Sequence, residues 1–129
     1  MVKDNTNPDY NPDNVFAQIL RGEIPSKGVY ESRDVYAFWD ASPAAPVHVL
    51  VIPRGAYIDF HDFTTRASKD EIIDFWESVD SVAQELGLLP NGFRLICNTG
   101  KDSGQIIPHF HVHILGGAPL GPLLAAPDA

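Results

Sequence analysis

The clearest hydrophobic pattern in the chain lies between residues 69 and 86. Apolar side chains recur there with the period of about 3.6 residues that is typical of an amphipathic helix. Ser68, followed three positions later by Glu71, predicts a capping box, and Gly87 stands where a left-handed residue ends a helix. We therefore expect a long helix over 69–86, with Phe75 and Trp76 anchoring it in the core against a sheet.

Shorter patterns surround this helix. Residues 14–21 predict a short helix capped by Asp13 or Asn14. The segment around His61 has no clear period, and we expect a surface loop there. Runs of β-favouring residues bounded by turn residues predict five strands: 28–31, 35–40, 48–53, 93–98 and 109–115. Short connections favour an α+β fold, a five-stranded antiparallel sheet with one long and one or two short helices.

The two ends differ from the middle of the chain. Residues 1–12 are rich in Asn, Pro and Asp and predict a mobile N-terminal arm. Residues 118–129 contain three prolines and a glycine, so they form a tail that neither continues a helix nor joins a central strand. The chain has 129 residues, which fits one domain, expected over residues 13–117.

Composition excludes several classes of protein. No run of about 18 apolar residues exists, so a membrane span is not expected. Residues 1–15 lack an apolar core of the kind that a secretory signal carries. Cys97 is the single cysteine, which excludes an intrachain disulfide and favours a reducing cytoplasm. A net charge of −8 disfavours nucleic acid as a partner but permits a small anionic ligand in one pocket.

Three histidines alternate near the C-terminus. In a strand, His109, His111 and His113 would project from one side at intervals of ~6.6 Å. Zinc binding and imidazole nucleophilic catalysis are both open to such a set, as are solvent-facing histidines on an edge strand. Because the three would span ~13 Å, the outer two could not both reach one ion, and the geometry favours catalysis. A neutral imidazole can attack phosphorus while its other nitrogen donates to a fixed acceptor.

The loop before these histidines has a composition suited to anion binding. Asn98, Gly100, Ser103 and Gly104 allow backbone N–H groups to converge on an anion. Such loops are often simple turns, and the position of this one directly before the histidines is what favours a phosphate site.

Residues 104–117, with the sequence GQIIPHFHVHILGG, resemble the signature of the histidine triad (HIT) superfamily. The resemblance extends upstream through residues 45–53 and 16–25, so it covers about residues 14–117. The ending Ile-Leu-Gly-Gly is more similar to the Hint branch than to the Fhit branch, which cleaves dinucleoside polyphosphates.

The resemblance implies hydrolysis or transfer at the α-phosphate of a purine nucleotide conjugate, through a covalent nucleotidyl-histidine. It implies that His111 is the nucleophile, that His113 and His48 line the site, and that His109 lies toward the leaving group. The implied phosphate contacts come from Asn98 and from the backbone of residues 104–107, namely Gly104, Gln105, Ile106 and Ile107.

The resemblance also implies contacts to the nucleoside. Asp40, next to Ala41, matches the carboxylate that takes the ribose hydroxyls, whereas from the residues alone a turn-capping role is favoured. The implied base pocket is apolar and consists of Val15, Phe16, Ile19 and Phe38. Members of the family are usually homodimers that join two such sheets through the long helix and a neighbouring strand, which would place Trp76 or Phe75 at the interface. The scheme needs no metal and no cofactor.

Three departures from the family pattern bear on function. Ile106 stands where Hint phosphoramidases commonly carry a serine, which affects the preferred leaving group. Residues 13–17 lack the Cys-x-x-Cys pair of a zinc site, and the tail has no tryptophan. Besides a phosphoramidase, the sequence leaves open a dinucleoside polyphosphate hydrolase, a nucleotide-binding scaffold with negligible turnover, and a metal-binding module.

Overall fold

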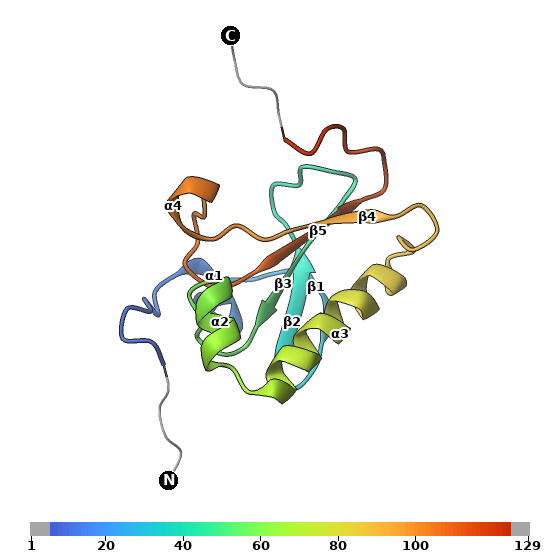
Figure 1. The fold of residues 1–129 in the computed structure, drawn as a ribbon. Helices are drawn as coiled ribbons and strands as arrows, with labels where there is room; N and C mark the ends of the chain where they lie inside the picture. Colours follow the sequence, from blue (N-terminus) through green and yellow to red (C-terminus); the bar gives the residue numbers. More distant parts are fainter. Residues whose placement is uncertain (1–5, 125–129) are drawn as a thin grey trace.

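A single antiparallel sheet of five strands, in the order β1-β2-β3-β5-β4, forms the centre of the fold (Figure 1). The computed structural model describes residues 6–124. The strands are β1 (Gly28–Glu31), β2 (Val35–Trp39), β3 (Val47–Pro53), β4 (Phe93–Ile96) and β5 (Val112–Gly116). The helices are α1 (Val15–Leu20), α2 (Phe60–Arg66), α3 (Lys69–Glu85) and α4 (Gly100–Ser103). The predicted α+β fold with a five-stranded antiparallel sheet is confirmed.

The long helix α3 begins and ends where its local signals predict. The Ser68 side chain accepts a hydrogen bond from the Glu71 amide, and the Glu71 carboxylate accepts one from the Ser68 amide, each at 3.1 Å. Gly87, with φ of 72°, lies just beyond the helix in the left-handed region. Phe75 is fully buried, but Trp76 remains 41% exposed. The prediction of a core anchor is therefore met by Phe75 and is wrong for Trp76 within this chain.

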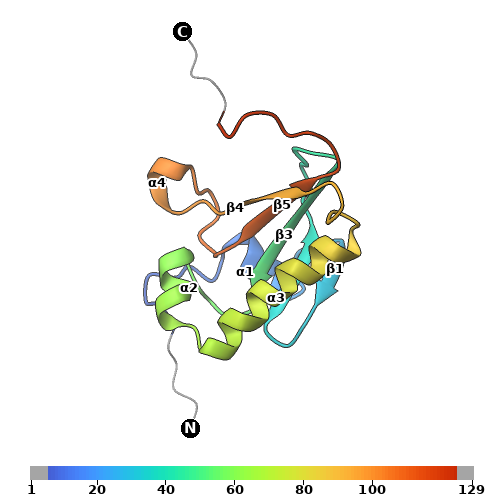
Figure 2. The same cartoon turned by 45° about the vertical axis from the view of Figure 1, so that its right-hand side comes forward.

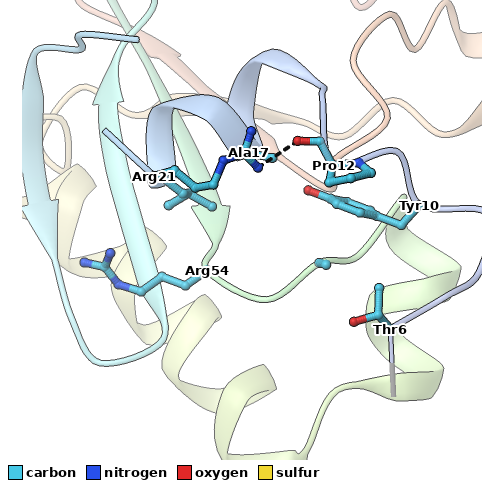
Figure 3. A pocket seen from close by; sticks show the side chains of 8 residues that line it. Thr6, Tyr10, Pro12, Ala17, Arg21 and Arg54 are labelled. Atoms are coloured by element: carbon cyan, nitrogen blue, oxygen red, sulfur yellow. Dashed lines mark hydrogen bonds between the residues drawn. The ribbon is translucent and has the colours of Figure 1, made fainter. Parts of the chain in front are cut away.

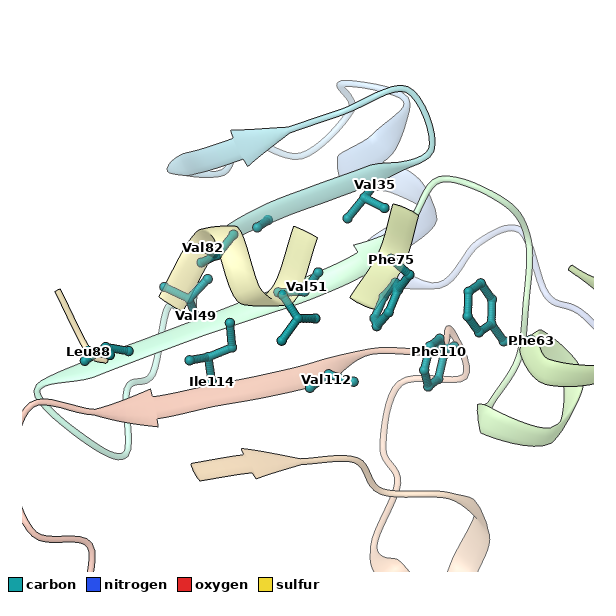
Figure 4. Packing of buried hydrophobic residues seen from close by; sticks show 12 residues of the cluster. Val35, Val49, Val51, Phe63, Phe75, Val82, Leu88, Phe110, Val112 and Ile114 are labelled. Atoms are coloured by element: carbon teal, nitrogen blue, oxygen red, sulfur yellow. The ribbon is translucent and has the colours of Figure 1, made fainter. Parts of the chain in front are cut away.

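Alternating side chains give the sheet two different faces. One face of β2, β3 and β5 carries the valines and other apolar residues that pack against α3, together with Phe63 and Phe110 (Figure 4). Figure 2 shows α3 lying across this side of the sheet. On the opposite face, Phe38, Leu50 and Ile52 pack against Phe16 of α1 in a second cluster. Because successive residues of a strand alternate, His48 and His113 lie on this second face, away from α3.

Three local predictions differ from the structure. Residues around His61 form the helix α2 rather than a loop, because Asp59 caps it by accepting from the Asp62 amide. With seven residues, α2 is too short to give a sequence period. A fourth helix, α4, occupies the glycine-containing loop. The strand β5 begins at Val112 instead of His109, because the Phe110 amide turns away from the sheet to donate to the Tyr57 carbonyl at 2.7 Å.

The two ends of the chain are described only in part. Residues 1–5 of the predicted arm and 125–129 of the predicted tail lie outside the described residues. Arg94 of β4 donates hydrogen bonds to two carbonyls of the tail, those of Gly121 and Pro122. Within residues 6–124, no helix has both the length and the hydropathy that a membrane span requires.

Candidate active site

A cavity of about 1,100 Å³ opens on the face of the sheet opposite α3. Every residue predicted as a substrate contact lines it, together with His111 and His113. Those contacts are Val15, Phe16, Ile19, Phe38, Asp40, Ala41, Asn98, Gly104, Gln105, Ile106 and Ile107. The cavity is also lined by Ile24, Lys27 and Trp39, which were not predicted because no sequence motif singles them out. The fold thus brings the predicted contacts together around one space, and binding by them stays a prediction.

The orientation of His111 is set by the main chain. Its Nδ1 lies 2.7 Å from the carbonyl oxygen of His109, which can only accept a hydrogen bond. Nδ1 therefore carries the proton, and Nε2 keeps its lone pair. The ring is 7% exposed and meets the edge of Phe16 at a centroid distance of 4.9 Å and an interplanar angle of 90°. His111 thus has the tautomer that a nucleophilic imidazole needs.

A second fixed tautomer is found at His48, on β3. Its Nδ1 accepts a hydrogen bond from the Ala44 amide at 3.0 Å, so Nε2 carries the proton of the neutral ring. Nε2 lies 2.9 Å from Nδ1 of His113, which accepts. The His113 ring in turn lies 5.1 Å from that of His111. The backbone at Ala44 therefore orients a chain of imidazoles that leads toward His111.

Asp40 approaches this chain at the end of β2. One carboxylate oxygen accepts from the Ser42 amide at 2.7 Å, which is the turn-capping role that the residues alone favour. The other oxygen lies 3.4 Å from His48 Nε2. Asp40 also lines the cavity, so its carboxylate caps a turn, faces an imidazole and is available to a ligand.

The side chains of Asp40, His48 and His113 lie close enough to resemble a metal site, with their nearest ligand atoms within 4.8 Å of one another. The donor set does not suit a metal ion. The nitrogen that His48 would offer, Nε2, bears the ring proton, because the Ala44 amide occupies the Nδ1 lone pair. Moving that proton to Nδ1 would set two N–H groups against each other. The three residues are better described as a hydrogen-bonded relay.

His109 does not line the cavity. Its side chain is fully buried, with Nε2 2.8 Å from the Pro53 carbonyl and Nδ1 2.6 Å from the Tyr10 hydroxyl. Both ring nitrogens are thus occupied by protein groups. The expectation that three imidazoles share one strand face is wrong, since β5 begins after His111. The expected role of His109 beside a leaving group gains no support from this position.

Burial keeps these imidazoles neutral. It lowers the pKa of His109 to about 4, although the hydrogen bond to Pro53 acts in the opposite direction. Burial, followed by the charges of His111 and His48, lowers the pKa of His113 to about 4. The pKa of His111 is also lowered by burial, while the His109 carbonyl and Asp40 favour its cation. A neutral His111 is the form that can attack an electrophile.

The loop before the histidines is held by one side chain. The Gln105 amide group donates to the carbonyls of Ile58 and Ile107, and its oxygen accepts from the Gly100 amide at 2.9 Å. The Gln105 backbone amide also donates within the loop, to the Gly100 carbonyl at 3.2 Å, so both the side chain and the amide of Gln105 hold the loop in place. Gly104 has φ of 82°, a left-handed conformation that favours glycine whatever the surrounding space. Ile106 is 91% exposed at the cavity.

The sequence model of the HIT domain matches residues 21–120. The chain belongs to the HIT family. It is 41% identical over 112 residues to the purine nucleoside phosphoramidase of Escherichia coli, covering 86% of this chain and 92% of that one. It is 48% identical over 115 residues to an uncharacterized HIT-like protein of Azospirillum brasilense, covering 89% of this chain and 94% of that one.

Solved structures of HIT proteins share the fold. A histidine triad protein from Clostridium difficile has a TM-score of 0.78 at 38% identity, covering 88% of this chain and 98% of that one. A HIT family hydrolase from Clostridium thermocellum has a TM-score of 0.78 at 39% identity, covering 88% and 97%. These similarities confirm the predicted membership of the HIT superfamily. The purine nucleoside phosphoramidase among the relatives is consistent with the predicted Hint-like branch.

Proposed function

We propose that this HIT protein is a Hint-type nucleotide hydrolase or transferase that acts on purine nucleoside phosphoramidates or related conjugates. The observation that carries the proposal is the hydrogen bond from His111 Nδ1 to the His109 carbonyl at 2.7 Å, beside a cavity that His111 lines. It leaves Nε2 as the reactive nitrogen. The phosphoramidase of Escherichia coli, similar over most of the chain, supports the same class of substrate.

In the proposed first step, the Nε2 lone pair of His111 attacks the α-phosphorus as the bond from phosphorus to the leaving nitrogen breaks. The leaving amine takes the electron pair of that bond and a proton from solvent water that reaches the open cavity. The imidazole, which keeps its Nδ1 proton, becomes a cation on forming the N–P bond. The His109 carbonyl and the nearby Asp40 carboxylate favour that cation, as they favour protonated His111.

In the second step, water attacks the phosphorus, and the N–P bond breaks with its electrons returning to Nε2. A cationic imidazole is a better leaving group than an anionic one, so the intermediate hydrolyses readily. A proton from the attacking water is lost to the site or to solvent, and the nucleoside monophosphate leaves. The backbone amides of Ile106 and Ile107 would stabilise the negative charge that builds on the phosphate oxygens, because those of Gly104 and Gln105 already donate within the loop. No step requires a metal or another cofactor.

The remaining cavity residues suit a nucleoside. Phe16 and Phe38, in contact at a centroid distance of 5.6 Å, belong to an apolar cluster on the cavity side of the sheet. They would form the base pocket with Val15 and Ile19. The Asp40 carboxylate, which lines the cavity, would accept from the ribose hydroxyls, so Asp40→Asn should raise KM more than it lowers kcat.

The direct test is release of AMP from adenosine 5′-phosphoramidate after treatment of the protein with a chelator. His111→Ala should lower the rate by at least about 10⁴-fold, since it removes the nucleophile. His61→Ala, which alters an exposed histidine of α2, should leave the rate unchanged. Activity that survives in His111→Ala, or that disappears on chelation of the wild type, would overturn the proposal.

A second candidate is hydrolysis of dinucleoside polyphosphates. It is favoured by Ile106, which is exposed at the cavity and supplies no hydroxyl that could donate to a departing amine. The same preparation assayed with diadenosine triphosphate decides between the two by the larger kcat/KM. Binding of AMP without turnover of either substrate would instead favour a nucleotide-binding scaffold.

We also propose a homodimer, in which the sheet is extended across two chains. The support is that the long helix and an edge strand carry exposed apolar side chains, namely Ile73 and Trp76 of α3 and Leu95 of β4. The strand β4 ends the sheet in the described part of the chain. Light scattering should give twice the mass of one chain.

The reducing cytoplasm stays the expected compartment, because Cys97 is the single cysteine of the chain.

A further inference from the structure

Tyr10 lies far from the histidines in sequence but contacts one of them directly. Its hydroxyl is 2.6 Å from Nδ1 of His109, and the two rings meet edge to face at a centroid distance of 5.7 Å. The side chain also forms part of a smaller pocket of about 340 Å³, with Pro12 and Arg21 (Figure 3). Tyr10 falls within residues 1–12, the predicted mobile arm, and no motif marks it as a site residue.

The direction of each hydrogen bond around His109 follows from the chemistry of its partners. The Pro53 carbonyl can only accept, so Nε2 of His109 carries the proton and donates at 2.8 Å. Nδ1 therefore keeps a lone pair, and the Tyr10 hydroxyl must donate to it. Burial raises the pKa of Tyr10, which keeps the phenol protonated and able to donate. The ring is thus held on both sides in one tautomer.

The same residue supplies the main-chain acceptor for His111. The His109 carbonyl accepts a hydrogen bond from Nδ1 of His111 at 2.7 Å, and the His109 amide donates one to the Ile107 carbonyl at 2.9 Å. Since His109 precedes the first residue of β5, the ladder of the sheet does not hold this peptide. The Phe110 amide fixes one side of this peptide by donating to the Tyr57 carbonyl at 2.7 Å, and the bonds that the His109 ring makes on either side fix the residue that carries the carbonyl.

We propose that Tyr10 is a positioning residue for His111, acting through the ring and the carbonyl of His109. Without the hydroxyl, a buried Nδ1 lone pair would lose its partner, and the ring would gain freedom to turn away from Pro53. The carbonyl would then no longer hold the His111 proton on Nδ1. The effect on catalysis rests on the proposed function, whereas the effect on the two rings does not.

The first test measures the imidazole nitrogens by ¹⁵N NMR, in the wild type and in Tyr10→Phe. In the wild type, Nδ1 of His109 should have the shift of a hydrogen-bonded acceptor and Nδ1 of His111 that of a protonated nitrogen. In Tyr10→Phe both signals should move. Unchanged signals in the variant, or a proton on Nδ1 of His109 in the wild type, would overturn the proposal. This result does not depend on any substrate.

The second test is kinetic and uses adenosine 5′-phosphoramidate. Tyr10→Phe should lower kcat by about tenfold with KM little changed, the effect of one lost hydrogen bond that orients the reacting group. The matched control is Tyr30→Phe, which removes a partly buried hydroxyl, bonded to Ser78 of α3, on the other face of the sheet. It should leave kcat unchanged. Equal kcat values for the two variants would overturn the proposal.

The pH profile separates positioning from a loss of stability. The hydrogen bond to the His109 carbonyl favours protonated His111, so its loss lowers the pKa of His111. The acidic limb of kcat/KM should therefore move to lower pH in Tyr10→Phe. The ionisable groups that act on His111 from its other neighbours, His113 and Asp40, are unchanged in the variant. An acidic limb that does not move in Tyr10→Phe would overturn the positioning role of Tyr10. A wild type without turnover would refute the proposed function, and the NMR test would still decide whether Tyr10 positions the two rings.

Discussion

The buried His109 should make the folded protein sensitive to acid. Burial lowers the pKa of its ring to about 4 in the folded state, whereas an imidazole in an unfolded chain titrates near about 6.5. Between these two values the unfolded chain binds a proton that the folded chain excludes. The free energy of unfolding therefore falls as the pH drops through this window, and the full stability is present above it.

The size of the effect follows from the same two values. Complete titration of His109 would lower the free energy of unfolding by roughly 3 kcal/mol. Acidification from about pH 7 to about pH 4.5 should cause a loss of about 2 kcal/mol of this total. Urea unfolding at these two pH values measures the loss in the wild type and in His109→Gln. Carboxylates and His113 titrate in both proteins, so the difference between the two losses isolates His109.

The control is His61→Gln, which changes an exposed histidine and should lose as much stability on acidification as the wild type. Equal losses in wild type and His109→Gln would refute the reasoning. If His109→Gln does not fold, NMR titration of the wild type gives the answer. The His109 resonance should stay constant from about pH 8 to about pH 5.5, and a midpoint near about 6.5 would refute a neutral buried ring.

Three further changes have expected outcomes. Ser68→Ala removes the capping box of α3 and should lower the free energy of unfolding by about 1 kcal/mol in urea; no change would contradict the cap. Phe75→Ala empties a fully buried site and should cost about 3–5 kcal/mol in the same assay, whereas a loss below about 1 kcal/mol would contradict its place in the core. Ile106→Ser should raise kcat/KM for the phosphoramidate relative to diadenosine triphosphate by about fivefold, through a hydroxyl near the leaving group; an unchanged ratio would exclude Ile106 from leaving-group selection.

The fold could be predicted mainly from short-range sequence patterns, namely helix caps and the alternation of apolar residues along strands. The start and end of α3 depend on residues within one helical turn, and the sheet depends on alternation that each strand displays by itself. Ser68 and Gly87 could therefore be assigned from sequence. The helix α2 could not, because it has few apolar positions and its cap resembles an ordinary turn. Trp76 has a helical period that places it near the core, but the period does not say which residues at its edge remain exposed.

The cavity residues were predicted through the resemblance to the HIT superfamily, since no local pattern links Phe16 to residues 104–107. Their gathering around one cavity is visible only in the fold. The position of His109 could not be predicted, because it depends on three distant partners. The Tyr57 carbonyl accepts from the next amide, the Pro53 carbonyl accepts from the His109 ring, and the Tyr10 hydroxyl donates to that ring. Alternation along a strand gives no information about either.

The tautomers of His111 and His48 are determined by main-chain atoms, the His109 carbonyl and the Ala44 amide. Any amino acid except proline supplies both kinds of group, so side chains around the cavity can change without altering which nitrogen of either ring is protonated. Substrate choice can therefore diverge in evolution while the nucleophile stays the same. An engineer could exchange Ile106 or Val15 to change substrate choice without changing either tautomer, but a proline at position 44 would remove the amide that fixes the relay.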